Sequence, residues 1–298
     1  MTKDPRVPYS ALTAYCAPAR PRSEIWRLLV GLVGIVVLYL GLNWLALAYV
    51  LSHLPPFRAA SVLQTLAAGS SPEGLMMLLA TFVPMAAAVI FVTRALHDRA
   101  GGTLFGAQAW TNARRVAAPL IALAVLLLPL ALLNPDVGNA GTLAQSLRWM
   151  PLALPLLAIQ IGAEELVFRG YMLQQLAART TNPILWMVVP SALFGALHYS
   201  TADFGANAIW PALWAFGFGC LAADLTARTG NLGAALGLHF ATNFSAMFLV
   251  GLYGQLDGLA LYTVVINTRD TAMLAPYMAI DAIAVLVSWL LARVILRV

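Results

Sequence analysis

Eight long apolar runs constrain the fold of this chain more than any other feature of its sequence. A helix that crosses a membrane needs about 20 mainly apolar residues. The fifth and sixth runs are shorter and reach that length only if they extend into their neighbours. The runs cover residues 28–51, 75–93, 116–133, 149–176, 184–198, 208–223, 232–252 and 273–296. They predict an all-α polytopic membrane helix bundle with about eight transmembrane helices.

The composition favours a membrane protein and argues against a nucleic-acid-binding one. Hydrophobic residues make up 61% of the 298 residues and charged residues only 10%, against about 25% charged residues in an ordinary soluble domain. The net charge of +5 comes from basic residues that flank the apolar runs and form no stripe, so we expect no nucleic-acid partner. Cys16 and Cys220 lie far apart and match no metal or redox spacing, so we expect two unpaired thiols.

The predicted organisation is a cytoplasmic N-terminal tail at 1–24 followed by a transmembrane domain at 25–298. The first apolar run is longer than the roughly 7–15 residues of a signal-peptide core, so we expect it to remain as a membrane helix. If eight helices alternate from a cytoplasmic N-terminus, thirteen Lys and Arg residues lie inside, and only Arg58, Arg148 and Arg269 lie in outside loops. Basic residues concentrate on the cytoplasmic side, so both termini are predicted to be cytoplasmic. The lack of eukaryotic targeting signals favours a bacterial cytoplasmic membrane.

The fourth run contains three charges, in the stretch IGAEELVFRGYMLQQL at 161–176. A charge at the bilayer centre costs about 2.5–3.5 kcal/mol on insertion scales, so three together need a reason. Glu165 and Arg169 are four residues apart and can pair on one helical face. Glu164 is turned by about 100° from Glu165 and shares its face with Phe168 instead, so it has no intrahelical partner. The pair could serve only to hold the bundle together, whereas an unpaired carboxylate suits proton transfer.

Two histidines lie inside later apolar runs, each with a partner four residues away. FGALHYS places Phe194 and His198 on one helical face, and LGLHFATNF does the same for His239 and Asn243. A single buried histidine is more often a hydrogen-bonded core residue than a functional one. Two of them, together with an amide and a spare glutamate, indicate a site.

These residue types can hydrolyse an amide bond without a covalent intermediate. A carboxylate and an imidazole can share a water and take its proton, while a second imidazole and an amide donate hydrogen bonds to the developing oxyanion. Alternatively, Glu164, His198 and His239 could hold a zinc ion, since two His and one Glu form a catalytic zinc shell. The sequence contains neither HExxH nor GxSxG, so it predicts neither a zincin helix nor a serine nucleophile elbow.

The three motifs EELVFR (164–169), FGALH (194–198) and HFATN (239–243) together resemble the CPBP intramembrane protease family. This is the family of CAAX prenyl proteases and of bacteriocin-processing or immunity (Abi) proteins. Its pattern is EExxxR, FxxxH and HxxxN/D, and all three elements are present in order, in a motif region that we place at 149–252.

The resemblance implies an eight-helix membrane endopeptidase whose site opens towards the cytoplasm. It implies that Glu164 and His198 activate the water and that His239 and Asn243 stabilise the oxyanion. The supporting residues would be Glu165, Arg169 and Phe194. The family is often labelled a metalloprotease family, yet a metal-free, glutamate-dependent mechanism is also attributed to it, so a divalent metal such as zinc stays open. The expected substrate is a membrane-embedded or lipid-modified peptide or protein.

The sequence also allows a membrane carrier or a non-catalytic scaffold, and it contains a glycine motif for helix packing. Intramembrane carboxylates and histidines also build proton-coupled carriers, although no internal repeat is visible. A non-catalytic scaffold or immunity protein is the other alternative. Gly233 and Gly237 form a GxxxG motif, which allows close helix approach and could draw the seventh run against the fourth.

Overall fold

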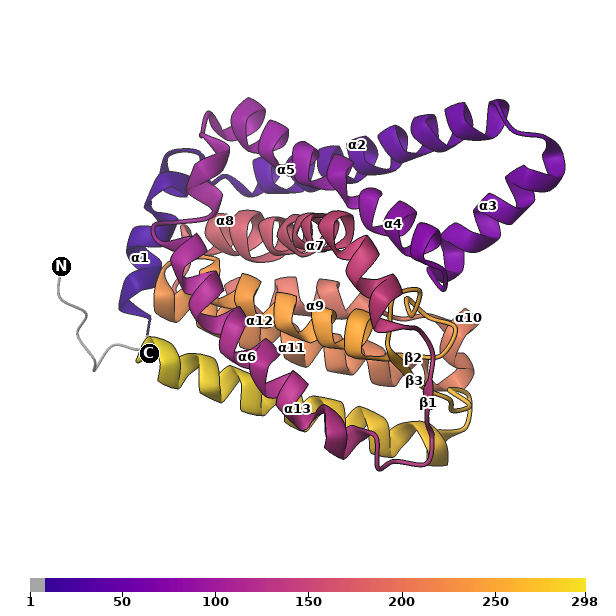
Figure 1. Ribbon diagram of the computed structural model, residues 1–298. Helices are drawn as coiled ribbons and strands as arrows, with labels where there is room; N and C mark the ends of the chain where they lie inside the picture. Colours follow the sequence, from indigo (N-terminus) through magenta and orange to yellow (C-terminus); the bar gives the residue numbers. More distant parts are fainter. Residues whose placement is uncertain (1–8) are drawn as a thin grey trace.

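The computed structural model describes residues 9–298 and consists almost entirely of helices (Figure 1). The α-helices are α1 (Ser10–Cys16), α2 (Ile25–Ser52), α3 (Pro56–Ala68), α4 (Pro72–Ala80), α5 (Phe82–His97), α6 (Ala109–Ala131), α7 (Leu143–Glu165), α8 (Leu173–Ala177), α9 (Val189–Ala196), α10 (Thr201–Phe204), α11 (Ile209–Thr229), α12 (Gly233–Phe244) and α13 (Thr271–Leu296). Three segments are π-helical, namely η3 (Leu166–Met172), η4 (Ile184–Val188) and η6 (Ser245–Leu249). Three short 3-10 turns are η1 (Ala17–Arg22), η2 (Gly101–Leu104) and η5 (Gly205–Ala208).

The helices confirm the predicted all-α, multi-pass membrane bundle. Within residues 9–298, six helical segments are long and apolar enough to cross a membrane. The six are Ile25–Ser52, Pro72–His97, Ala109–Ala131, Leu143–Ala177, Thr201–Thr229 and Thr271–Leu296. The fifth and seventh predicted runs form shorter helices, at Ile184–Ala196 and in α12 with η6. Eight membrane crossings and cytoplasmic termini therefore stay predictions.

The seventh predicted run, 232–252, is wrong at its end. The helix stops at Leu249, and Val250–Leu252 forms strand β2. This strand pairs in parallel with β3 (Tyr262–Val264), which also pairs antiparallel with β1 (Val137–Asn139). The resulting three-stranded sheet joins two loops that are far apart in sequence, and the apolar pattern gave no sign of it.

The second predicted run, 75–93, is divided between α4 and α5. Helix α4 ends at Ala80, Thr81 lies between the two helices, and α5 starts at Phe82. Pro84 lies in the first turn of α5. A proline has no N–H to donate to the carbonyl four residues earlier and crowds that carbonyl, so the helix is interrupted just before it.

The segment before α2 packs against the bundle from Tyr9 onward; residues 1–8 of the predicted tail lie outside the described chain. Tyr15 and Cys16 of α1 are buried. The Tyr15 hydroxyl donates to the carbonyl oxygen of Leu104 at 2.6 Å and to that of Arg169 at 3.2 Å. Burial raises the pKa of the Cys16 thiol to about 12, so this thiol stays protonated at neutral pH. The segment therefore supports the backbone beneath one of the predicted site residues.

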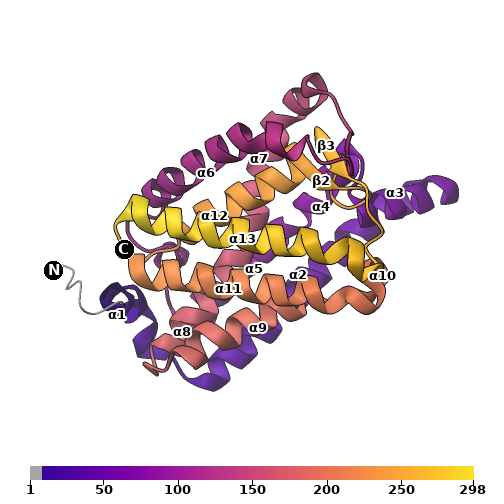
Figure 2. The ribbon, with the colours of Figure 1, turned by 90° about the horizontal axis from the view of Figure 1, so that it is seen from below.

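Helix α12 occupies the inside of the bundle, and its glycines set its closest contact. In Figure 1, α7 and α12 lie between α2 at the top and α13 at the bottom, and Figure 2 shows α12 between α6 and α13. A side chain at Gly233 or Gly237 would collide with the backbone oxygen of Ala109 or Ala113 in α6. The GxxxG motif thus draws α12 against α6, the third run, and the expected contact through these glycines with the fourth run was wrong.

Candidate active site

Two helices place four polar side chains opposite one another. On α7, Gln160 and Glu164 are four residues apart and share a face; on α12, His239 and Asn243 do the same. The Asn243 amide donates to Gln160 Oε1 at 3.2 Å, and His239 Nε2 lies 3.6 Å from Glu164 Oε2. The two contacts are one helical turn apart on each helix, so they form two facing pairs between antiparallel helices.

The predicted pairing of Glu165 with Arg169 is confirmed. Arg169 Nη1 lies 3.1 Å from Glu165 Oε1, and both side chains are fully buried. His239 Nδ1 lies 2.8 Å from the same carboxylate oxygen. A buried ion pair is stable only if its charges are compensated by close contacts. Here the guanidinium of Arg169 and the imidazole of His239 both contact the carboxylate of Glu165.

Glu164 lies next to this buried group but differs from Glu165 in access. Its side chain is 15% exposed, against 0% for that of Glu165. It has no partner on its own helix among the described residues, and its carboxylate lies 3.6 Å from His239 Nε2. A group outside the protein can therefore reach Glu164 while Glu165 stays sealed.

A π-helical turn begins directly after the two glutamates. Segment η3 starts at Leu166 and carries Arg169. Such turns are rare, are often found at functional sites, and change the direction in which side chains leave the helix. All seven residues of η3 are buried, so this turn faces the centre of the bundle.

Aromatic rings surround the charged residues. The Phe194 ring lies 5.1 Å from that of Phe168, 4.6 Å from His198 and 6.2 Å from His239, measured between centroids. The Arg169 guanidinium carbon lies 4.7 Å from the Phe194 centroid, a distance at which a cation is attracted to a ring face. Phe194 therefore joins the histidine that follows α9 to the cluster on α7 and α12.

His198 is the predicted site residue with the least direct connection. It lies two residues after the end of α9 and is partly exposed. Its Nδ1 is hydrogen-bonded to the Phe194 carbonyl oxygen at 2.8 Å, which leaves Nε2 free to face another group. Over residues 9–298 the structure gives it no hydrogen bond to Glu164 or His239. The other three catalytic candidates are brought together by direct contacts or by sharing a helix face.

The three side chains considered for zinc, Glu164, His198 and His239, are not grouped around one point in the described part of the chain. No group of three or more His, Cys, Asp or Glu side chains within residues 9–298 is arranged to hold a metal ion. His239 Nε2 lies 3.6 Å from Glu164 Oε2, and among the described residues His198 forms no hydrogen bond or ion pair with either side chain.

Two residues of this cluster were missed by sequence reasoning. Gln160 is buried and contacts Asn243; its spacing of four residues before Glu164 was the available signal. Phe218 of α11 packs its ring 4.8 Å from that of His239. Nothing in the sequence distinguishes Phe218 from other apolar residues, because its role depends on how α11 packs against α12.

The comparison with known proteins concerns the same part of the chain. Residues 146–245 match the family model described as type II CAAX prenyl endopeptidase Rce1-like, and this stretch contains all three motifs. This match agrees with the resemblance of the motif-bearing region to the CPBP intramembrane protease family.

A relative of this chain is an uncharacterized protein, YyaK, of Bacillus subtilis (strain 168). The two are 32% identical over 162 residues, which cover 51% of this chain and 54% of YyaK. The chain thus spans about half the length of the curated relative that it matches. No solved structure matches the chain.

Proposed function

We propose that this chain is an intramembrane endopeptidase that hydrolyses peptide bonds with a water molecule activated by Glu164. The observation that carries the proposal is the contrast between two adjacent glutamates around one histidine. Glu165 is sealed and paired with Arg169, whereas Glu164 is accessible and faces His239. A general base must reach the proton that it removes, and only Glu164 meets that requirement.

The proposed reaction begins with the water. Glu164 takes one proton from the water, and the water oxygen forms a bond to the carbonyl carbon of the substrate. The carbonyl oxygen becomes negative in the tetrahedral intermediate. As the C–N bond breaks, the proton held on Glu164 passes to the leaving nitrogen. The products are a carboxylic acid and an amine, and Glu164 returns to its starting state.

His239 and Asn243 are suited to stabilise the oxyanion. The short contact between His239 Nδ1 and Glu165 favours a proton on Nδ1, because an ionised carboxylate only accepts hydrogen bonds. His239 can then donate to an oxyanion only when Nε2 carries a second proton. The resulting imidazolium balances the charges, with Arg169 opposite Glu165 and His239 opposite Glu164. Asn243 uses one amide hydrogen on Gln160 and has a second to donate.

The role of His198 in the proposal comes from the family resemblance. Its free Nε2 would share the water with Glu164, while its Nδ1 bond to the Phe194 carbonyl fixes the ring orientation. Phe194 would position this histidine, and Arg169 would hold Glu165 in place. The proposed substrate class, a membrane-embedded or lipid-modified peptide or protein, follows from the location of the site among membrane helices and from the name of the matching family model.

The test is cleavage of a mixed peptide library, which includes prenylated peptides, by the purified wild-type chain and by Glu164→Ala, read by mass spectrometry. We expect cuts by the wild type that are absent from the variant, because removal of a general base costs about 10²–10⁴-fold in rate. Both proteins are prepared identically, so that a contaminating protease would cut in both samples.

Cuts that persist unchanged in Glu164→Ala would contradict the proposed mechanism. No cuts by either protein, with lipid-modified substrates present, would favour the carrier or scaffold alternatives. Proton-gradient-dependent substrate flux in vesicles would then indicate a carrier.

A further inference from the structure

A cavity at one end of the bundle contains two arginines from separate helices. It has a volume of about 460 Å³ and is lined by Arg115 of α6 and by Ile295, Leu296 and Arg297 at the end of α13. In both overall views, the first turns of α6 and the C-terminal end of α13 lie at the same end of the molecule (Figures 1 and 2). Two guanidinium groups from different helices thus meet at one opening.

No acidic residue lines this cavity, and Asp224, the acidic residue of α11, already has partners. Asp224 accepts hydrogen bonds from Arg228 at 2.8 Å, from Tyr9 at 2.9 Å and from Trp289 at 3.0 Å. Within residues 9–298, neither Arg115 nor Arg297 forms an ion pair. Both are exposed, so their charge is available to a ligand from outside.

The residues around the cavity are those expected at the level of lipid headgroups. Arg115 directly precedes the apolar stretch of α6, and Arg297 directly follows α13. Trp110, in the first turn of α6, is 64% exposed, and exposed tryptophans concentrate at membrane–water interfaces. Ile295 and Leu296 supply an apolar edge beside the two charges.

We propose that this cavity binds a phosphate group between Arg115 and Arg297, and that the phosphate belongs to the headgroup of an anionic phospholipid. Guanidinium groups match the geometry of phosphate oxygens, and basic pockets between membrane helices bind anionic lipid headgroups. The apolar edge would take the start of an acyl chain. This site does not depend on the proposed peptidase activity.

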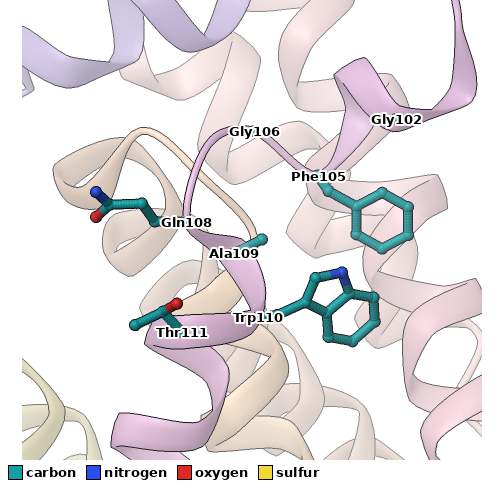
Figure 3. A pocket seen from close by; sticks show the side chains of 7 residues that line it. All are labelled: Gly102, Phe105, Gly106, Gln108, Ala109, Trp110 and Thr111. Carbon is teal, nitrogen blue, oxygen red and sulfur yellow. The ribbon is translucent and has the colours of Figure 1, made fainter.

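A second cavity on the same helix provides a contrast. It has a volume of about 310 Å³, and Figure 3 shows that its lining includes Phe105, Gln108, Trp110 and Thr111. The Phe105 and Trp110 rings lie 5.5 Å apart, and no charged residue lines the cavity. This second cavity has no basic side chain to bind a phosphate, so we expect phosphate only in the cavity lined by Arg115 and Arg297.

The test measures the first lipid bound by the detergent-solubilised full chain, by native mass spectrometry. The probes are phosphatidylglycerol and phosphatidylcholine with the same acyl chains, and inorganic phosphate as a competitor. The variants are Arg115→Gln, Arg297→Gln and the double variant. Arg114→Gln is the matched control, because it removes the same charge from the neighbouring residue, which does not line the cavity.

We expect phosphatidylglycerol to bind more tightly than phosphatidylcholine. Each arginine removed should weaken its binding about fivefold, and removal of both about 25-fold, while Arg114→Gln stays within about twofold of the wild type. Equal binding of the two lipids, or an equal loss in Arg114→Gln, would overturn the proposal. Arginine-dependent binding of inorganic phosphate that displaces the lipid would keep the phosphate site and overturn the lipid as its source.

Discussion

Helix α7, which carries part of the polar cluster, and its neighbour α11 are packed differently from the outer helices α2, α6 and α13. In the most apolar 18-residue windows of Leu143–Ala177 and Thr201–Thr229, half of the residues are buried. The corresponding fraction is 17% in α2 and only 11% in α6 and α13. All of these segments are apolar enough to span a membrane, so hydropathy alone does not reveal which helices form the centre. The central helices can hold charges because their neighbours exclude lipid from them.

The largest expected effect on stability lies in the buried ion pair of the centre. Arg169→Ala leaves the Glu165 carboxylate buried without its cation, which should lower the free energy of unfolding by about 3–5 kcal/mol. The measurement is thermal or denaturant unfolding of the purified protein in detergent.

The double variant Glu165→Gln with Arg169→Met is the control for this prediction. It removes both charges together and should recover most of the loss, because no uncompensated charge remains. A single Arg169→Ala variant as stable as the wild type would show that the pair contributes little to the fold.

A pair of leucine truncations compares the centre with the periphery directly. Leu157 of α7 is 0% exposed, whereas Leu126 of α6 is 73% exposed. Leu157→Ala should destabilise the protein by about 2–5 kcal/mol through the cavity that it leaves. Leu126→Ala should change the stability by less than about 0.5 kcal/mol. Equal losses in the same unfolding assay would contradict the division between central and peripheral helices.

A pair of glycine substitutions gives the smallest expected effect. A methyl group at Gly233 would collide with the backbone of α6, whereas at Gly41 of α2 it meets no atom within 4 Å. Gly233→Ala should cost about 1–3 kcal/mol by overpacking. Gly41→Ala should stabilise the protein by about 0.4–1 kcal/mol, because alanine restricts the unfolded chain. The unfolding midpoints should therefore shift in opposite directions.

The sequence predicted the helical character of the chain and much of the polar cluster for physical reasons. Apolar runs of membrane length have few structural alternatives to a helix, and a spacing of four residues places side chains on one helical face. The contact between Glu165 and Arg169 depends only on that local geometry, so it was predictable. The contact between His239 and both glutamates joins two helices, and a single helix pattern cannot supply it.

The features that the sequence did not predict depend on distant contacts. The strands β1, β2 and β3 have three residues each, too few to give an alternating pattern. The packing of Tyr15 beneath Arg169 joins the first helix to the middle of the chain. The helix that packs against the GxxxG motif is α6. The surface of α6 depends on residues outside the motif, so the motif alone could not predict this contact.

The most direct test of the account compares Glu164→Gln with Glu165→Gln in two assays, the cleavage rate on a peptide that the wild type cuts and the melting temperature. Both variants replace a carboxylate by an amide of the same size. We predict that Glu164→Gln melts like the wild type but loses about 10²–10⁴-fold in rate, whereas Glu165→Gln loses stability because Arg169 is left without its carboxylate. A folded Glu164→Gln variant that cleaves at the wild-type rate would contradict the central claim that this glutamate activates the water.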